Sequence, residues 1–409
     1  MRTTDLHVQG IGLPQMRQMM QLRDAMILLA AVFAPLTATR AFCQEEAVAI
    51  LPEGVKAVWQ MDKAYRETTP TREKICLNGL WRWQPAQTSA DRAPQKNWGY
   101  FKVPGCWPGI TDYMQKDFQT VHSHPNWKNE RLGSVAAAWC ERTLSVPQEW
   151  AGRRVALSVD YLNSYAVVFI DGTKRGEIRF PGGELDLTPH LRPGSTQVLS
   201  LLVVAMPLKG VLLSYTDSNS AREVKGKVER RGLCGDIFLV STPSSPRISD
   251  LKVDTSVRKS EITLDTALQE LPADGRYSLR GRIAKDGRTV HEFTTRTFNR
   301  SDLDRGRIAF SEQWKPGARW DIHTPSNKFE LTLSLIETGG RVLDVFFHAP
   351  FGFRDFWIDG RDFYLNGSRI FLSALPLDNA QIGAALATYG GARETLERLK
   401  SIGINFVYT

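Results

Sequence analysis

This sequence lacks three features that would place it in a large class of proteins at once. It has no run of five Lys or Arg residues, no Cys-x-x-Cys pair, and no apolar run longer than the twelve residues of 25–36. Its net charge of +8 is therefore not gathered into the basic patch typical of nucleic-acid-binding proteins. The cysteines lack the spacing of a zinc site, and twelve apolar residues are too few to span a bilayer. We expect no nucleic-acid partner, no metal, no cofactor and no membrane span.

The apolar run at 25–36 instead predicts export. Arg17 and Arg23 precede it, and Thr39-Arg40-Ala41 follows with small residues at the positions that a signal peptidase reads. A charged segment, an apolar segment and a small-residue site in this order are typical of a secretory signal. We expect residues 1–41 to be a signal peptide and the protein to be periplasmic or extracellular.

Cysteine is scarce, with five residues in 409. An exported protein permits disulfides, but the spacings are wide and irregular. This favours buried thiols in domains large enough to fold without cross-links. The sequence leaves open any pairing among Cys76, Cys106, Cys140 and Cys234.

Most of the chain reads as short strands. Asp171-Gly172 lies between two strand-like runs and predicts a hairpin, as do Asp286-Gly287 and Gly339-Gly340. Many short strands without a long helix indicate a sandwich or jelly roll. After a leader at 42–75, we expect one such domain over 76–243. The linker Thr242-Pro243-Ser244-Ser245-Pro246 leads to a second domain at 247–350 of immunoglobulin-like size.

The pattern changes after residue 350. Residues 390–403 place Ala392, Leu396, Leu399 and Ile402 on one helical face, and the strand-like run 404–408 follows. A strand, a helix and a strand in series predict parallel strands, which need neighbours to cover both faces. We expect 351–409 to be the truncated opening of an α/β domain and the chain to be the front of a longer protein.

Short motifs occur in a fixed order along residues 60–409. They are LNGLWRW at 77–83, VPGCW at 103–107, WCERTLSVPQEW at 139–150, VFIDG at 168–172, DLTPHL at 186–191, GLCGDIFL at 232–239, GFR at 352–354 and DFYLNG at 362–367.

In this order the motifs resemble those of glycoside hydrolase family 2. The family patterns are "NGxW.F", "VPgsW", "W.rr.f.vP..w", "v.vNG", "DiTpyl", "GIwrdV.L" and "GfR.f…f.lNG". Cys234 stands where tryptophan is common. The resemblance implies a multidomain, mainly β chain. Its parts would be a jelly-roll galactose-binding-like domain, an immunoglobulin-like β-sandwich and the first strand, helix and strand of a (β/α)8 TIM barrel.

The resemblance also implies an activity. Family members are exo-acting β-galactosidases, β-glucuronidases and β-mannosidases that retain anomeric configuration through two glutamates on barrel strands four and seven. A whole barrel needs about 250 residues, so both glutamates are expected beyond Thr409. We expect the parent protein to remove a terminal β-linked sugar from a glycan or glycoside, and residues 1–409 alone to be inactive.

Four residues are candidates for substrate contact. The polar segment 213–231 matches a family loop that reaches the barrel mouth, which makes Asp217 and Asn219 candidate hydroxyl partners. Trp107 and Trp127 lie beside turns and are candidate stacking platforms, with core packing as the alternative.

Two other groupings carry less information. Glu394 and Glu397 share a helix face, where we expect solvated residues beside Arg393 and Arg398 rather than a catalytic pair. His122 and His124, with Asp112 and Asp117 nearby, lack the fixed spacing of a metal site.

The alternative for the whole chain is a non-catalytic carbohydrate-binding or adhesion protein built from the two β domains.

Overall fold

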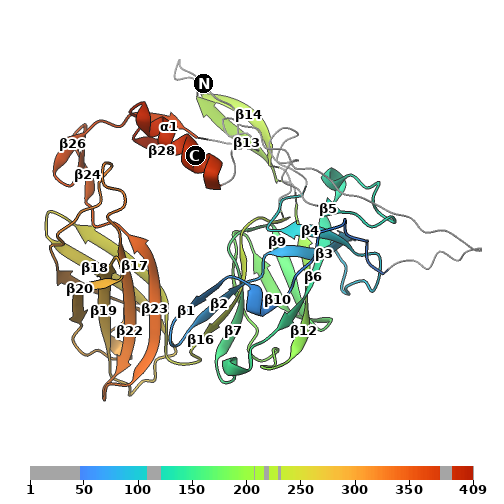
Figure 1. The fold of residues 1–409 in the computed structure, drawn as a ribbon, viewed down its shortest axis with the longest axis horizontal. Helices are drawn as coiled ribbons and strands as arrows, with labels where there is room; N and C mark the ends of the chain where they lie inside the picture. Colours follow the sequence, from blue (N-terminus) through green and yellow to red (C-terminus); the bar gives the residue numbers. More distant parts are fainter. Residues whose placement is uncertain are drawn as a thin grey trace, which may run out of the picture. The chain divides into compact units, whose positions relative to one another are not determined.

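The computed structural model describes residues 47–107, 121–206, 232–377 and 389–408, and the backbone of 208–215 and 221–228. The expected signal peptide at 1–41 lies outside the described residues, as do Cys43, Asp112, Asp117, Asp217 and Asn219. The described chain is mainly β, as predicted, and α1 (Tyr389–Ser401) is its α-helix (Figure 1). Its short 3-10 helices are η1 (Met61–Lys63), η3 (Leu132–Ser134), η4 (Gln148–Trp150) and η5 (Arg300–Asp302).

The first β region contains two large sheets. The five-stranded sheet has the order β1 (Arg66–Thr68), β2 (Glu73–Cys76), β16 (Ile237–Thr242), β7 (Arg154–Val159) and β11 (Gly183–Asp186). The seven-stranded sheet has the order β10 (Thr173–Arg179), β9 (Tyr165–Ile170), β12 (Thr196–Val204), β6 (Ala137–Ser145), β3 (Gly79–Ala86), β4 (Gly99–Val103) and β5 (Val121–His122). The segment 42–75, expected as a leader, thus supplies β1 and most of β2.

The sequence of β12 shows how these sheets are covered. Leu199, Leu201 and Val203 belong to the main core cluster, which also contains Ile75 of β2 and Leu239 of β16. Leu202 and Val204 of β12 belong to a second cluster on the opposite face of the sheet. Successive side chains alternate between the faces of a strand. The end of β12, residues 201–204, is a continuous apolar run because both faces of the strand are buried there.

A two-stranded hairpin corrects one expectation. The segment 213–231 was expected as a polar loop, but β13 (Leu208–Tyr215) and β14 (Ala221–Val228) form an antiparallel ladder from Leu208↔Val228 to Tyr215↔Ala221. Ladder hydrogen bonds join backbone groups, so charged side chains do not prevent the pairing. β15 (Gly232–Leu233) then pairs with β8 (Leu162–Asn163).

The linker is as short as predicted. β16 ends at Thr242, and the first strand of the second β region begins at Arg247. This region has a three-stranded and a four-stranded sheet. Their strands are β17 (Arg247–Ser256), β18 (Glu261–Gln269) and β21 (Arg307–Gln313) in one, and β20 (Arg288–Thr294), β19 (Tyr277–Lys285), β22 (Phe329–Glu337) and β23 (Val342–Phe351) in the other.

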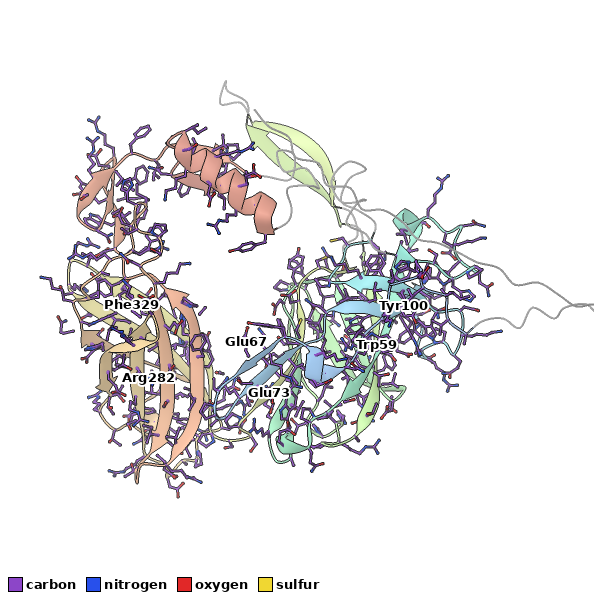
Figure 2. All side chains as sticks on the ribbon, in the orientation of Figure 1. Trp59, Glu67, Glu73, Tyr100, Arg282 and Phe329 are labelled. Carbon is purple, nitrogen blue, oxygen red and sulfur yellow. The ribbon has the colours of Figure 1, made fainter. Side chains whose placement is uncertain are left out.

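Both sheets of the second region contribute to a single core. Buried and less buried residues alternate along β18, which places Ile262 and Leu264 in the same cluster as Leu333 of β22. Phe329, labelled in Figure 2, packs edge-on against Trp314 with ring centroids 5.0 Å apart. This cluster is distinct from the clusters of the first region, so each region has its own hydrophobic core.

The C-terminal segment begins with a three-stranded sheet and continues with parallel strands. The strands are β24 (Phe356–Asp359), β25 (Asp362–Leu365), β26 (Ser368–Ile370), β27 (Ala374–Pro376) and β28 (Phe406–Tyr408). β27 and β28 pair in parallel, and α1 lies between them in sequence. Gly403 follows α1 with a φ of +87°, the left-handed conformation that commonly ends a helix. The predicted strand, helix and strand are present.

Candidate functional site

Two of the family-like motifs, at 77–83 and 232–239, are joined by hydrogen bonds. Asn78 Nδ2 donates to Asp236 Oδ1 at 2.8 Å, and the Ile237 backbone N–H donates to Asn78 Oδ1 at 3.1 Å. Asn78 therefore ties the start of β3 to the start of β16. The Asn366-Gly367 motif has a similar role, because Asn366 accepts from the Asp355 N–H at 3.1 Å and donates to the Trp320 carbonyl at 2.8 Å. Both asparagines hold separate segments of the chain together.

The predicted aromatic contacts lie in an aromatic cluster at one edge of the seven-stranded sheet. Trp83 of β3 is at its centre, and its ring lies 5.4 Å from Phe101, 5.7 Å from Trp107 and 5.2 Å from Trp127. Trp107 is 1% exposed and Trp127 is 6% exposed. Both residues thus pack as core residues. Sugar contact by either ring stays a prediction, and it requires a ring face that this packing covers.

Glycines allow the rings of the aromatic cluster to pack this closely. A Cβ on Gly232 would lie 2.1 Å from Cζ3 of Trp107, and a Cβ on Gly99 would lie 2.4 Å from Cζ2 of Trp127. Trp127 is also fixed by its indole N–H, which donates to the Asn97 carbonyl at 2.9 Å. At these two positions the tryptophan ring therefore occupies the space that a side chain would need.

Asp217 and Asn219 lie between β13 and β14 in sequence, outside the described residues. The described ladder ends at Tyr215 of β13 and Ala221 of β14. Substrate contact by Asp217 and Asn219 stays a prediction.

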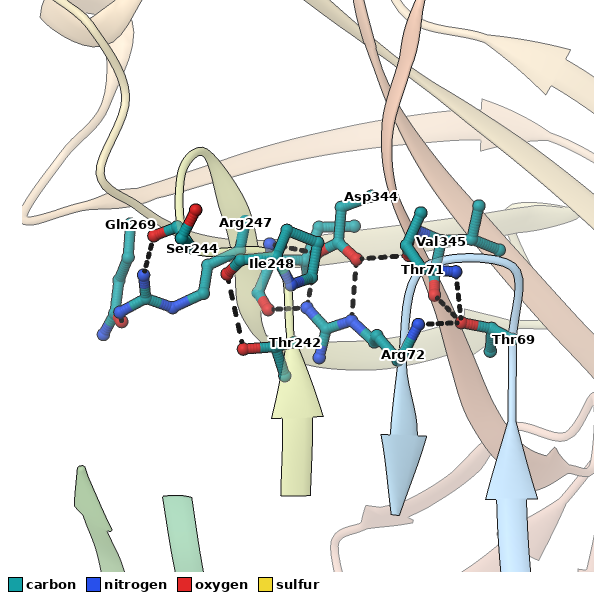
Figure 3. A network of polar contacts seen from close by, with 11 residues as sticks. Thr69, Thr71, Arg72, Thr242, Ser244, Arg247, Ile248, Gln269, Asp344 and Val345 are labelled. Carbon is teal, nitrogen blue, oxygen red and sulfur yellow. Dashed lines mark hydrogen bonds and ion pairs between the residues drawn. The ribbon is translucent and has the colours of Figure 1, made fainter. Parts of the chain in front are cut away.

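A buried carboxylate joins the two β regions. Asp344 of β23 has no exposed surface, and it accepts hydrogen bonds from Arg72, from the Thr71 hydroxyl at 2.9 Å and from the Ile248 N–H at 2.8 Å (Figure 3). The Thr69 hydroxyl donates to the Val345 carbonyl at 2.8 Å. We call Thr69, Thr71, Arg72, Ile248 and Asp344 the junction network.

A second buried carboxylate joins the second β region to the C-terminal segment. Asp355 accepts from Arg258 Nε at 3.0 Å and from the Ser256 hydroxyl at 3.0 Å. Burial alone would raise the pKa of Asp355, but the hydrogen bonds from Arg258 and Ser256 outweigh it and leave the pKa below its ordinary value. Asp355 is therefore held as a carboxylate where β24 begins.

The described acidic residues of the C-terminal helix are surface residues, as expected. Glu394 pairs with Arg398 at 2.5 Å, and Glu397 pairs with Arg393 at 2.8 Å. All four side chains are more than half exposed. In a β/α unit the chemistry lies at the carboxyl ends of the strands, which here are Pro376 of β27 and Tyr408 of β28. A helix surface is not such a place.

Among the described residues, the histidines near β5 are not part of a group of possible metal ligands. His122 is in β5, and Nδ1 of the buried His124 accepts from the Asn126 N–H at 3.2 Å. Within the described ranges, no three His, Cys, Asp or Glu side chains group as metal ligands.

No helix in the described part of the chain combines the length and apolar character needed to cross a membrane.

The fold matches solved structures of β-glucuronidases. One from Ruminococcus gnavus, in complex with D-glucaro-d-lactam, matches with a TM-score of 0.58 at 14% identity over 84% of this chain. One from Lactobacillus rhamnosus matches with a TM-score of 0.58 at 16% identity over 84%. The enzyme from Bifidobacterium dentium, complexed with coumarin-3-O-glucuronide, matches with a TM-score of 0.53 at 20% identity over 76%. This chain has a β-glucuronidase-like fold.

The match covers part of each enzyme. It includes 56%, 55% and 53% of the three structures, so the chain spans little more than half of their length. No family model and no curated protein matches the chain. The likeness therefore concerns the fold of a glycosidase and the order of its regions.

Proposed function

We propose that this chain is the N-terminal part of an exported, retaining β-glycosidase of the glycoside hydrolase family 2 type. The first β region would be its jelly-roll domain, the second its immunoglobulin-like domain, and 351–409 the start of its TIM barrel. The observation that carries the proposal is the parallel pair β27 and β28, with α1 between them, after two β regions. This order accompanies a fold match to β-glucuronidases over 84% of the chain.

The chemistry would come from residues outside 1–409. A retaining glycosidase needs a carboxylic acid and a carboxylate about 5 Å apart across the scissile bond. In the described C-terminal segment, Glu394 and Glu397 are each engaged by an arginine on the helix surface. We therefore assign the acid and the nucleophile to later strands of the barrel. β-D-Glucuronides are the substrates to test first, because the matched structures are β-glucuronidases.

Two measurements test this function. The nucleotide sequence after the codon for Thr409 should continue in frame for several hundred codons and encode one glutamate after a fourth strand and another after a seventh. The purified longer protein should hydrolyse an aryl β-glycoside in a panel of glucuronide, galactoside and mannoside, whereas purified 1–409 should not exceed the buffer blank. Robust turnover by 1–409 would contradict the assignment of the catalytic residues.

The candidate contacts of Asp217 and Asn219 can be tested in the longer protein. Replacing Asp217 and Asn219 by alanine should raise KM at least several-fold if they bind sugar hydroxyls, because each lost hydrogen bond costs about 1 kcal/mol. Asp274→Ala is the matched control, since Asp274 is an exposed acid in the second β region. A stop codon after residue 409, together with saturable glycan binding by 1–409, would support the carbohydrate-binding alternative instead.

A further inference from the structure

Two cysteines that are distant in sequence lie in contact. Cys106 Sγ donates a hydrogen bond to Cys234 Sγ at 3.3 Å, although the residues are 128 positions apart. Cys106 follows β4, and Cys234 follows β15. Both are partly exposed, so a small thiol reagent can reach them.

The backbone holds the two sulfurs in place. The Gly105 N–H donates to the Leu233 carbonyl at 2.7 Å, which joins the residues immediately before the two cysteines. The Cys234 N–H donates to the Tyr161 carbonyl at 3.0 Å. Sulfurs in a disulfide lie about 2 Å apart, so small rotations of the two side chains cover the remaining distance.

The other described cysteines have different surroundings. Cys140 is fully buried in β6, and this burial raises the pKa of its thiol far above the ordinary value. A thiol that stays protonated is a poor nucleophile. Cys76 lies in β2 of the five-stranded sheet, and its partial exposure makes it a matched control for Cys106 and Cys234.

We propose that Cys106 and Cys234 form a reversible disulfide that joins the segment after β4 to the segment after β15. β12 of the seven-stranded sheet ends at Val204, and β15 begins at Gly232, where it pairs with β8 in a separate two-stranded sheet. A bond at Cys234 fixes the chain just after β15 to the turn after β4, beside the aromatic cluster. The proposal rests on the sulfur contact and the backbone around it, and is independent of the glycosidase function.

The reaction balances with a small disulfide such as oxidised glutathione as oxidant. One cysteine thiolate attacks the oxidant, forms a mixed disulfide and releases one glutathione thiolate. The second cysteine thiolate attacks the protein sulfur of that mixed disulfide and displaces the second glutathione. The two cysteines together lose two protons and two electrons, and the oxidant is reduced to two thiols.

Peptide mapping tests the proposal directly. The whole chain is equilibrated with oxidised glutathione, its remaining thiols are alkylated, and it is digested with trypsin without reduction. We expect peptides 103–116 and 232–247, which carry Cys106 and Cys234, to appear as one linked species that separates on reduction. Recovery of both peptides in alkylated form, or linkage of either to another cysteine, would overturn the proposal.

Thermal unfolding supplies a second readout. A cross-link that closes a loop of this length should raise the Tm of the oxidised chain by about 5 °C or more over the reduced chain. Cys106→Ser and Cys234→Ser should each abolish this difference, and Cys76→Ser should keep it. The same oxidation-dependent rise in Cys106→Ser would refute the pairing, whatever the absolute stability of that variant.

Discussion

Replacing Arg72 by methionine should destabilise the chain far more than its partly exposed position suggests. The change removes both charged donors to Asp344 and leaves that carboxylate with the Thr71 hydroxyl and the Ile248 N–H. Asp344 has no exposed surface, so water cannot replace the guanidinium. Methionine keeps most of the aliphatic length of arginine, which limits the loss of packing.

The magnitude follows from burial. Breaking a buried ion pair by removing one partner costs about 3–5 kcal/mol. The Arg72 side chain is 18% exposed, which allows some relaxation and favours the lower end, about 3 kcal/mol. With a urea m-value of about 2 kcal/mol/M, the unfolding midpoint should fall by about 1.5 M, as followed by tryptophan fluorescence.

Arg247→Met is the matched control. Arg247 lies close to the junction network and donates to the Ser244 carbonyl at 3.0 Å and to Gln269 at 2.8 Å, both in exposed positions. Its loss should cost at most about 0.5 kcal/mol. The double variant Arg72→Met/Asp344→Asn should lose less than the sum of the single variants, because a neutral amide needs no counter-charge. Equal midpoints for Arg72→Met and Arg247→Met would refute the reasoning.

Two further predictions concern other positions. Gly232→Ala should cost at least about 2 kcal/mol, because its Cβ would overlap the ring of Trp107. Gly152→Ala shares a positive φ but meets no atom within 4 Å, so it should cost about 1 kcal/mol, and equal urea midpoints for the two would contradict the packing argument. Asp355→Asn should cost about 1–2 kcal/mol at pH 6 because Arg258 loses a charged acceptor. The pKa of Asp355 is lowered in the folded protein, so this stabilisation is present above the ordinary carboxyl pKa and is lost as pH falls through the folded pKa. A difference in unfolding free energy between wild type and Asp355→Asn that is the same at pH 6 and pH 3 would argue against it.

Turn chemistry could be predicted from the sequence because it is local. Asp171 has a φ of +49° and Gly172 a φ of +75°, and Ile170 pairs with Thr173 across the turn. Asp286 and Gly287 repeat this conformation in the second β region. A two-residue hairpin turn needs positive φ at both positions, which Asp-Gly tolerates, so a dipeptide was sufficient to predict each hairpin.

The packing of the tryptophans could not be predicted in this way. Trp107 is a core residue because Gly232, distant in sequence, leaves room for its ring. The hairpin β13–β14 was missed because the charges at 222, 223, 225 and 227 were interpreted as those of a solvated loop, whereas its ladder depends on backbone pairing. Both features are set by contacts that a local pattern does not contain.

The separation of Arg72 and Asp344 along the chain has a consequence for how the protein is made. The two residues are 272 positions apart, whereas the last strand of the first region ends at Thr242. A ribosome adding about 5–20 residues per second reaches Asp344 roughly 5–20 s after Thr242. During this interval the first region can complete both of its sheets while the guanidinium of Arg72 is still in water. The nascent chain is thus expected to pass through a stage in which the first β region is folded and Arg72 has no carboxylate partner. This stage ends when β23, which carries Asp344, has been synthesised.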